Sequence, residues 1–416
     1  MFDVAVIGGG VVGCAIARQL AVRGFKVVIL EKEKELLSGA SSGNSGITTV
    51  GFDVPLGSLE LKLIKRSREI NLEFYKKLGI PHRKVGALMV AWSEAELRRL
   101  PDVVKHAEST GVTNLVTLGP TELLRIEPNL NPSLLGGILF PDETVVDAWL
   151  LPIVYVRDAL QCGAVVNREA EVTRADWSND SKFWKLYLAN GSQVEASCVV
   201  NAAGLYGDKL EECRIPVSVA PKFYIKPRKG QFVVFEKSDD RMLNHIIMPV
   251  PSKAGRGVLL FTSVYGDIVV GPTAEEQSAR DVMSVDEITL KKLVNRAVLI
   301  LPCLKGLKIS SFYAGLRPGS DNEDYVIHSD SNCPWVTVAG IRSTGVSASL
   351  AIAEHVEKMI VECGLNVLST KVENDLPTRP HIEFDSKQEA IQLNGQLFRV
   401  THHLSKLGIP MKCSRL

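Results

Sequence analysis

The sequence predicts an α/β fold with α+β character, in which a mainly parallel sheet is joined by a second, antiparallel sheet. Two observations support this prediction. Three segments, far apart in the chain, each read as a strand, a turn of small residues and the start of a helix. Between the second and third of them, the runs GQFVVFEK, RGVLLFT and GDIVVGPT read as short strands with no helical pattern between them. With 416 residues, the chain is long enough for two closely joined domains.

The first segment carries the pattern of a dinucleotide site. Residues 2–7 (FDVAVI) read as a buried strand, and Gly8, Gly10 and Gly13 complete the motif G-x-G-x-x-G before a helix. Gly8 permits the tight turn, Gly10 lets the backbone approach a pyrophosphate, and Gly13 lets the helix pack close to the strand. A second strand, KVVIL, ends at Glu31, whose carboxylate can accept hydrogen bonds from a ribose. We therefore expect a bound dinucleotide with its phosphates at the helix N-terminus.

A loop of small polar residues follows, where an NAD dehydrogenase would have another plain crossover unit. Its sequence is SSGNSGITTVGFD (residues 41–53), and the long helical segment LGSLELKLIKRSREINLEFYKKLG comes next. This combination resembles the D-amino-acid-oxidase-like (DAO) superfamily of FAD-dependent oxidoreductases. The resemblance implies that FAD is the cofactor and that Lys32 joins Glu31 beside it. It also implies that the loop lies against the flavin, through Ser42, Gly43, Asn44, Ser45 and Gly46.

Two later segments resemble further FAD contacts of the same superfamily. In VEASCVVNAAGLYGDKL the contacts are Ala203 and Gly204, and the preceding strand places the backbone of Val172 against the adenine. In PWVTVAGIRSTGVSASLAIAEHV, a glycine turn and a helix N-terminus face the N1/O2 edge of the flavin, where their dipoles stabilise the anionic reduced form. The contacts implied there are Gly340, Arg342, Ser343, Thr344, Gly345 and Val346.

The resemblance covers about residues 1–360 and implies a division into discontinuous domains. A Rossmann-like FAD-binding domain of the glutathione-reductase or DAO type takes residues 1–82, 142–215 and 310–362. An inserted substrate domain with an antiparallel sheet takes residues 83–141 and 216–309. Residues 363–416 form a C-terminal extension, in which EAIQLNGQLFRVTHHLSKL is expected to be a helix that packs back onto the body.

Four stretches resemble a narrower group, the glycerol-3-phosphate oxidases and dehydrogenases and their L-2-hydroxyglutarate dehydrogenase relatives. These stretches contain VGFDVPLGSLELKL, GDIVVGPTAEEQ, FYAGLRPGSDNEDYVI and AGIRSTGVSAS. The resemblance implies hydride transfer to flavin N5 from a small anionic 2-hydroxy substrate, with glycerol 3-phosphate first and L-2-hydroxyglutarate second. Arg317 is the expected anion clamp, because a guanidinium binds a phosphate or carboxylate through two hydrogen bonds. Arg256 is the second candidate.

The chain departs from these relatives at Thr49, which stands where they carry a histidine that acts as general base. Threonine cannot take up a proton at neutral pH with useful driving force. One interpretation is that another group serves as base, for which His82, His245 and His328 are weak replacements. A second is that the substrate is an amine or amino acid, whose neutral form needs no base. A third is a flavoprotein without catalysis, and all three stay open.

Composition excludes several other classes of function. A net charge of +1 gives no reason to expect nucleic acid as a partner, and no apolar run reaches the roughly 20 residues of a bilayer span. The N-terminus has no signal-peptide pattern. Eight cysteines without a C-x-x-C pair argue against a metal site, a disulfide framework or an iron–sulfur cluster, so oxygen or a quinone is the expected electron acceptor. The final Ser414, Arg415 and Leu416 resemble the S-K-L address, which predicts a peroxisomal import receptor as partner and the peroxisome as location, with the cytoplasm as alternative.

Overall fold

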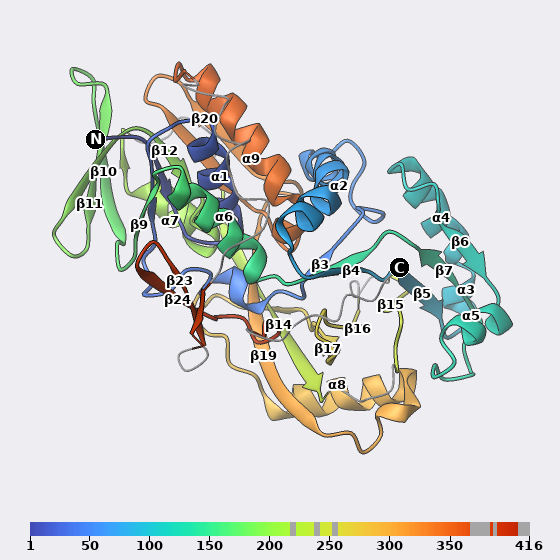
Figure 1. The fold of residues 1–416 in the computed structure, drawn as a ribbon. Helices are drawn as coiled ribbons and strands as arrows, with labels where there is room; N and C mark the ends of the chain where they lie inside the picture. The colour runs from blue at the N-terminus through green and yellow to red at the C-terminus, as the bar shows by residue number, and fades with distance from the viewer. Residues whose placement is uncertain (217–221, 237–241, 252–256, 367–382, 386–388, 407–416) are drawn as a thin grey trace.

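The computed structural model of the protein describes residues 1–216, 222–236, 242–251, 257–366, 383–385 and 389–406. Two of the predicted features, Arg256 and the terminal Ser414-Arg415-Leu416, lie outside these residues. Within the described residues the chain forms two nine-stranded sheets and two three-stranded ones, with helices packed around them (Figure 1). This arrangement confirms the predicted mixed α/β fold. No helix in this part of the chain has the length and hydropathy that crossing a membrane requires.

The first large sheet has a parallel centre with an antiparallel ribbon at one side. Its central strand β1 (Phe2–Ile7) pairs in parallel with β2 (Val27–Leu30) on one side and β12 (Gln193–Asn201) on the other. Near its end, β12 also pairs in parallel with β21, and near its start it pairs with β11 of the ribbon. The other strands are β9 (Val165–Asn167), β10 (Val172–Ser178), β11 (Phe183–Leu188), β13 (Arg214–Ile215), β20 (Val326–Asp330) and β21 (Trp335–Ala339).

Helices cover this sheet because their apolar faces match its buried Val and Ile side chains. Helix α1 (Val11–Val22) packs against both α6 (Leu150–Gln161) and α9 (Gly345–Glu362), and α2 (Leu59–Leu78) packs on α9 (Figure 1). Small buried residues on α1, among them Ala17 and Ala21, allow the close approach. The predicted helix after the small-residue loop is therefore α2. Ser58 caps its first turn by accepting a hydrogen bond from the Leu61 N–H at 3.1 Å.

The second large sheet is antiparallel except for one parallel pair, β5 with β15. Its strands are, in sheet order, β18 (Glu275–Glu276), β14 (Ile225–Phe235), β17 (Ile268–Gly271), β16 (Leu259–Thr262), β15 (Ile246–Pro249), β5 (Ala87–Ala91), β7 (Gly136–Phe140) and β6 (Val116–Leu118), with β19 (Ile309–Ser320) paired to β14. Its helices are α3 (Glu94–Leu97), α4 (Leu100–Ser109), α5 (Pro120–Ile126) and α8 (Glu287–Ile300). The three runs predicted as strands correspond to β14, β16 and β17.

The predicted domain boundary at residue 310 does not coincide with the boundary between the sheets. Strand β19 pairs with β14 from Ser320 to Ile309, so residues 310–320 belong to the second sheet. A small sheet of β3 (Ile47–Thr48), β8 (Thr144–Val146) and β4 (His82–Lys84) joins the loop after the first segment to the turn after β7. The remaining helical elements are α7 (Gly207–Glu212), η1 (Ala40–Gly43), η2 (Gly204–Tyr206) and η3 (Pro302–Leu304).

The helix predicted near the C-terminus is wrong. Its residues form a hairpin of β23 (Ala390–Leu393) and β24 (Gln396–Arg399), beside β22 (Glu383–Asp385). The turn is Asn394-Gly395 with positive φ at both positions, 45° and 75°, which is the geometry that two-residue hairpins favour. The hairpin packs against the first half of the chain, where Arg168 Nη1 donates to the Leu397 carbonyl at 2.9 Å.

Candidate active site

A cavity of about 1100 Å³ lies between the two large sheets. Residues that follow the carboxyl ends of the parallel strands β1, β12 and β21 form one side of it, which is where open α/β sheets bind ligands. Strands β14 and β19 of the second sheet contribute the other side, through residues such as Phe232 and Gly315. The cavity is large enough for a dinucleotide together with a small molecule.

The glycine turn after β1 brings backbone against the cavity. Gly8 has φ of +111°, and a Cβ there would lie 2.4 Å from the Ala202 carbonyl oxygen, so only glycine fits. A Cβ on Gly13 would lie 2.0 Å from the Gly8 oxygen, which explains why α1 can pack so close to the strand. Gly8 and Gly10 line the cavity, whereas Gly13 lies behind them in the packing. Gly10, the N-cap of α1, has no side chain that could cap the helix, and Ser41 Oγ accepts the Val11 N–H at 3.0 Å. The positive end of the helix dipole at this N-terminus favours a phosphate.

Glu31 lies beside this turn and lines the cavity. Its carboxylate accepts the Gly9 N–H at 2.6 Å and the Glu33 N–H at 2.9 Å, and burial raises the pKa of the carboxyl group. Lys32 Nζ lies 4.1 Å from the centre of the Tyr206 ring. The other residues predicted at this end, Val172, Ala203 and Gly204, also line the cavity.

The small-residue loop is held by its own side chains and by β19. The Asn44 side chain donates to the Ser41 carbonyl at 2.7 Å and accepts the Gly46 N–H at 2.7 Å. A Cβ on Gly43 would lie 2.3 Å from the Gly315 Cα, so the loop crosses β19 in close contact. Gly43, Asn44 and Ser45 line the cavity, but Ser42 and Gly46 do not. Small size at the latter positions therefore serves the turn itself.

The turn before α9 forms a further wall. Its predicted residues all line the cavity: Gly340, Arg342, Ser343, Thr344, Gly345 and Val346. Glu60, on the first turn of α2, holds this turn by pairing with the Arg342 guanidinium and accepting the Thr344 hydroxyl at 2.7 Å. The N-cap of α9 makes no side-chain cap, as in α1. Two helix N-termini, the glycine turn and Glu31 in one cavity of this size fit an FAD molecule.

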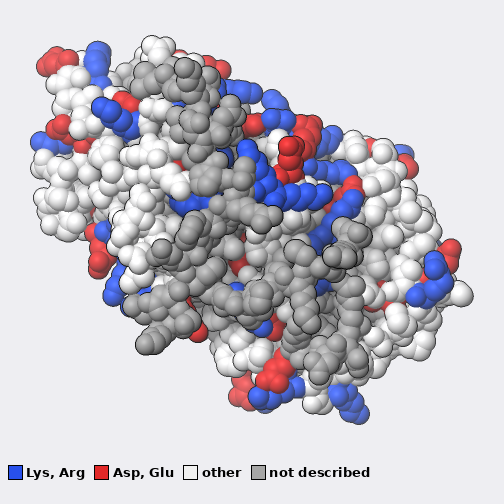
Figure 2. Space-filling view, in the orientation of Figure 1, with Lys and Arg blue, Asp and Glu red and all other residues white. Residues whose placement is uncertain are grey.

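Basic side chains gather on β14 and β19 at the same cavity. Arg317 lines it, and its Nη2 donates to the Thr273 carbonyl at 3.0 Å, which orients the guanidinium. A Cβ on Gly230 would lie 2.6 Å from that nitrogen, so the glycine makes room for it. Arg228 is the direct cross-strand partner of Arg317 and also lines the cavity, as does Lys226. On the face shown in Figure 2, acidic and basic side chains are interspersed rather than separated into fields of one sign.

Thr49 faces the cavity and contacts a buried acid that the sequence did not reveal. Its hydroxyl donates to Glu143 Oε1 at 3.1 Å, and the Val50 N–H donates to the same oxygen at 3.0 Å. Glu143 lines the cavity but is only 2 % exposed to solvent. Burial raises its pKa to about 7, although these two hydrogen bonds lower it. The charges of Asp53, which raises the pKa, and of Arg68, which lowers it, have smaller effects. Among the described residues, no histidine lines the cavity.

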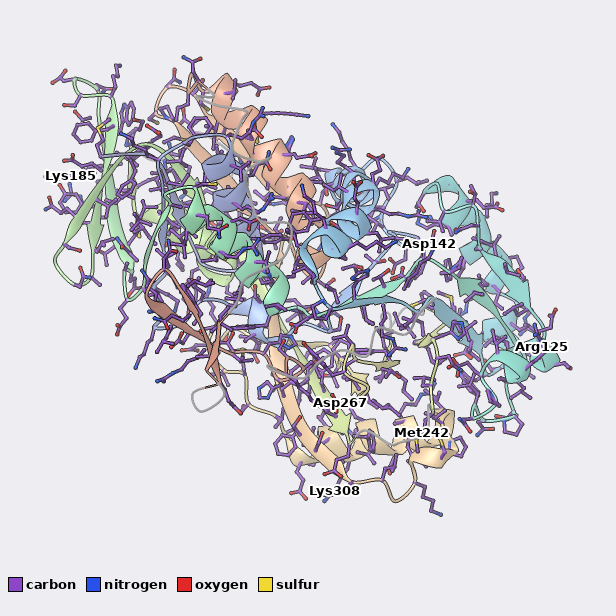
Figure 3. All side chains as sticks on the ribbon, viewed as in Figure 1. Arg125, Asp142, Lys185, Met242, Asp267 and Lys308 are labelled. Carbon is purple, nitrogen blue, oxygen red and sulfur yellow. The ribbon has the colours of Figure 1, made fainter. Side chains whose placement is uncertain are left out.

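The residues after the C-terminal hairpin contact the small-residue loop from outside. His402 is buried, and its Nε2 lies 3.1 Å from the Asn44 carbonyl oxygen, which also accepts the Tyr313 hydroxyl at 3.2 Å. The His403 ring stacks on Tyr313, with 5.1 Å between ring centres. Lys406 Nζ pairs with Asp267, labelled in Figure 3, at 2.6 Å. The hydrogen bonds from His402 and Tyr313 to Asn44 hold the loop, and neither of these two side chains lines the cavity.

Comparisons with known proteins agree with this construction. Residues 3–359 match the family described as DAO, FAD dependent oxidoreductase. The glycerol 3-phosphate dehydrogenase of Caloramator mitchellensis is 30% identical over 360 residues, covering 86% of this chain and 73% of the relative. The mitochondrial L-2-hydroxyglutarate dehydrogenase of Arabidopsis thaliana is 27% identical over 401 residues, covering 85% of this chain and 82% of the relative.

A solved structure gives the same result for the fold. Dithionite-reduced L-α-glycerophosphate oxidase from Mycoplasma pneumoniae, with FAD bound, has a TM-score of 0.80 and 26% identity to this chain. The alignment covers 86% of this chain and 94% of that one. The cavity residues derived above from β1, β12 and β21 lie within the matched range, so FAD is the cofactor. The chain thus belongs to the DAO family of FAD-dependent oxidoreductases.

Proposed function

We propose that the protein oxidises a small anionic 2-hydroxy compound, with glycerol 3-phosphate as the first substrate and L-2-hydroxyglutarate as the second. The observation that carries this proposal is the arginine pair, Arg317 on β19 and Arg228 opposite it on β14, in the wall of the FAD cavity. A phosphate or carboxylate between these guanidiniums would be held by charge-assisted hydrogen bonds, which fixes the position of the carbon next to it. Several relatives have names that specify the same class of substrate.

The oxidation removes a hydride and a proton from the carbon and oxygen of a CH–OH group. FAD, when bound, supplies the acceptor for the hydride. The chain must hold the anion, keep water from the reacting carbon and take the hydroxyl proton. Apolar side chains, Phe232 and Met248 among them, line the same cavity and exclude water. Molecular oxygen or a quinone is the proposed final acceptor of the two electrons.

Thr49 favours a second candidate function, the oxidation of an amine or amino acid. The neutral form of an amine carries a lone pair and no proton that must leave before hydride transfer, so a histidine at this position is not needed. The arginine pair would then bind the carboxylate of an amino acid. A protein that binds FAD without catalysis is the third candidate.

One experiment separates these candidates. The purified yellow protein is mixed without air with glycerol 3-phosphate, L-2-hydroxyglutarate or an amino acid, and the visible flavin band is followed. We expect the band to bleach with glycerol 3-phosphate and to return in air, with hydrogen peroxide released if oxygen is the acceptor. Bleaching by amino acids alone would establish the second candidate. Bleaching by dithionite but by no substrate would favour the third.

A further inference from the structure

Glu143 occupies a fixed place between the two sheets. It follows β7 and precedes β8, and its carbonyl accepts the N–H groups of Val85 and Gly86 at 3.1 and 2.9 Å. The next residue, Thr144 on β8, pairs with Thr48 on β3. Continuing this antiparallel register by one position brings Glu143 opposite Thr49, and the two side chains are in hydrogen-bond contact. The backbone thus sets the distance between the hydroxyl and the carboxylate.

Among the described residues, the Thr49 hydroxyl has two hydrogen-bond partners, which leaves one lone pair of its oxygen for a ligand. It donates its single proton to Glu143 Oε1, and its oxygen accepts the Gly51 N–H at 3.1 Å. A hydroxyl oxygen has two lone pairs, so one more donor can be accepted. The Thr49 backbone N–H is held by Ser347 Oγ at 3.0 Å, on the first turn of α9, and both residues line the cavity. A substrate hydroxyl in the cavity is the donor that suits the second lone pair.

We propose that Glu143 is the proton acceptor of the oxidation and that the Thr49 hydroxyl relays the proton to it. This inference rests on the proposed function. In the step, the substrate O–H bond breaks and its proton passes to Thr49 Oγ1, while the Thr49 proton passes to Glu143 Oε1. The C–H hydrogen would leave with its electron pair as hydride, for which bound FAD would be the acceptor, and the carbon–oxygen double bond would form. One proton and one hydride leave the substrate, and Thr49 is unchanged.

The charges around Glu143 suit this role. A base works best when its pKa lies near the working pH, and that of Glu143 is raised to about 7. The charged groups that act on it are Asp53 from the loop after Thr49, which raises the pKa, and Arg68 from α2, which lowers it. The adjacent Asp142, labelled beside α2 in Figure 3, is held by Arg68 and by Lys84 at 2.6 Å. Asp142 does not line the cavity, so Glu143 is the acid of this turn that can reach a ligand.

The test measures the rate of flavin bleaching by glycerol 3-phosphate, without air, from pH 5.5 to 9. In the wild type we expect the rate to fall below about pH 7 as Glu143 takes up a proton. In Glu143→Gln the rate should drop by about 10²–10⁴-fold and lose that inflection. Thr49→Val should lose most of the rate, and Thr49→Ser, which keeps the hydroxyl, should restore it. Thr48→Val is the matched control and should retain the wild-type profile.

Two readouts other than turnover show that the variants are intact. Flavin content and visible spectrum should be unchanged in Glu143→Gln, and its melting temperature should rise relative to wild type as the pH is raised. A Glu143→Gln rate within threefold of wild type, with the same inflection, would overturn the role of Glu143. A fully active Thr49→Val would overturn the relay. Failure of wild-type protein to bleach with any 2-hydroxy anion would instead remove the proposed function, and the inference with it.

Discussion

The wall of the cavity proposed for the nucleotide (the nucleotide wall: Gly8, Gly10 and Glu31) differs in origin from the proposed substrate wall, made of Thr49, Glu143, Arg228 and Arg317. The nucleotide wall comes mainly from backbone atoms and from residues within the first 31 positions of the chain. The proposed substrate wall is assembled from side chains far apart in sequence, such as Thr49 and Glu143, which are 94 residues apart. The first wall therefore depends on steric fit, and the second on charge and hydrogen bonds. Substitutions should accordingly abolish binding at the first and alter rates at the second.

The largest effect is expected at Gly8. An alanine there would force a Cβ to 2.4 Å from the Ala202 carbonyl oxygen at a φ of +111°. The close contact and the positive φ are both steric costs. Together they should lower the folding stability by at least about 3 kcal/mol and cause the loss of bound FAD. Visible absorbance per protein and thermal melting measure the two effects. Gly119→Ala is the control, because φ there is −79° and the added Cβ would lie 3.7 Å from Glu122. A yellow, stable Gly8→Ala protein would contradict the steric account.

Sequence reasoning placed the glycine turn and Glu31 together because these parts are local in the chain. A strand, a glycine turn, a helix and a terminal acid follow one another within 31 residues, and each has a residue type that physics requires. Glu143 could not be reached in this way, since only the pairing of β3 with β8 brings it to Thr49. The Thr49 departure left another base as one of three interpretations and gave no position for such a base. Arg228 stayed hidden for the same reason, as its register with Arg317 is set by the second sheet.

The C-terminal hairpin shows a different kind of failure. The apolar residues of EAIQLNGQLFRV suit either a helix or two short strands, and the helix prediction gave too little weight to the Asn394-Gly395 pair. That dipeptide favours positive φ at both positions, which no helix interior accepts. The turn chemistry was therefore the decisive local signal.

The next effect concerns the stability cost of burying Glu143. Its folded-state pKa of about 7 exceeds the usual value of 4.5, so the native state binds the extra proton between these two pH values. The native state therefore loses stability as the pH rises through this range, and the loss is complete above about pH 8. Glu143→Gln removes the loss and should be more stable than wild type by up to about 3 kcal/mol at pH 8, but not at pH 4.5. Denaturant unfolding at several pH values measures this, and a difference independent of pH would contradict it.

A smaller, graded loss is expected at Arg317. Arg317→Gln removes the charge-assisted hydrogen bonds to the substrate anion and should lower kcat/KM by about 30- to 100-fold, mainly through KM. Arg317→Lys keeps the charge but not the planar fork, so about tenfold is expected. The matched control is Arg125→Gln on α5, which lies at the edge of the molecule in Figure 3. Equal kcat/KM in all four proteins would remove Arg317 from the proposed substrate wall, and unchanged FAD content would confirm that the nucleotide wall is independent of it.

The smallest effect should come from His402, which contacts the small-residue loop and does not line the cavity. The Leu404 N–H donates to its Nδ1 at 3.1 Å, so the proton lies on Nε2 and is donated to the Asn44 carbonyl. Burial lowers the pKa of the imidazole to about 4, so this donor persists unchanged from pH 6 to 9. His402→Leu removes one hydrogen bond of about 1 kcal/mol and should speed FAD release about fivefold at every pH in that range. His402→Gln keeps a donor and should release FAD at a rate within twofold of wild type. If both variants released FAD equally fast, packing rather than this hydrogen bond would hold the loop.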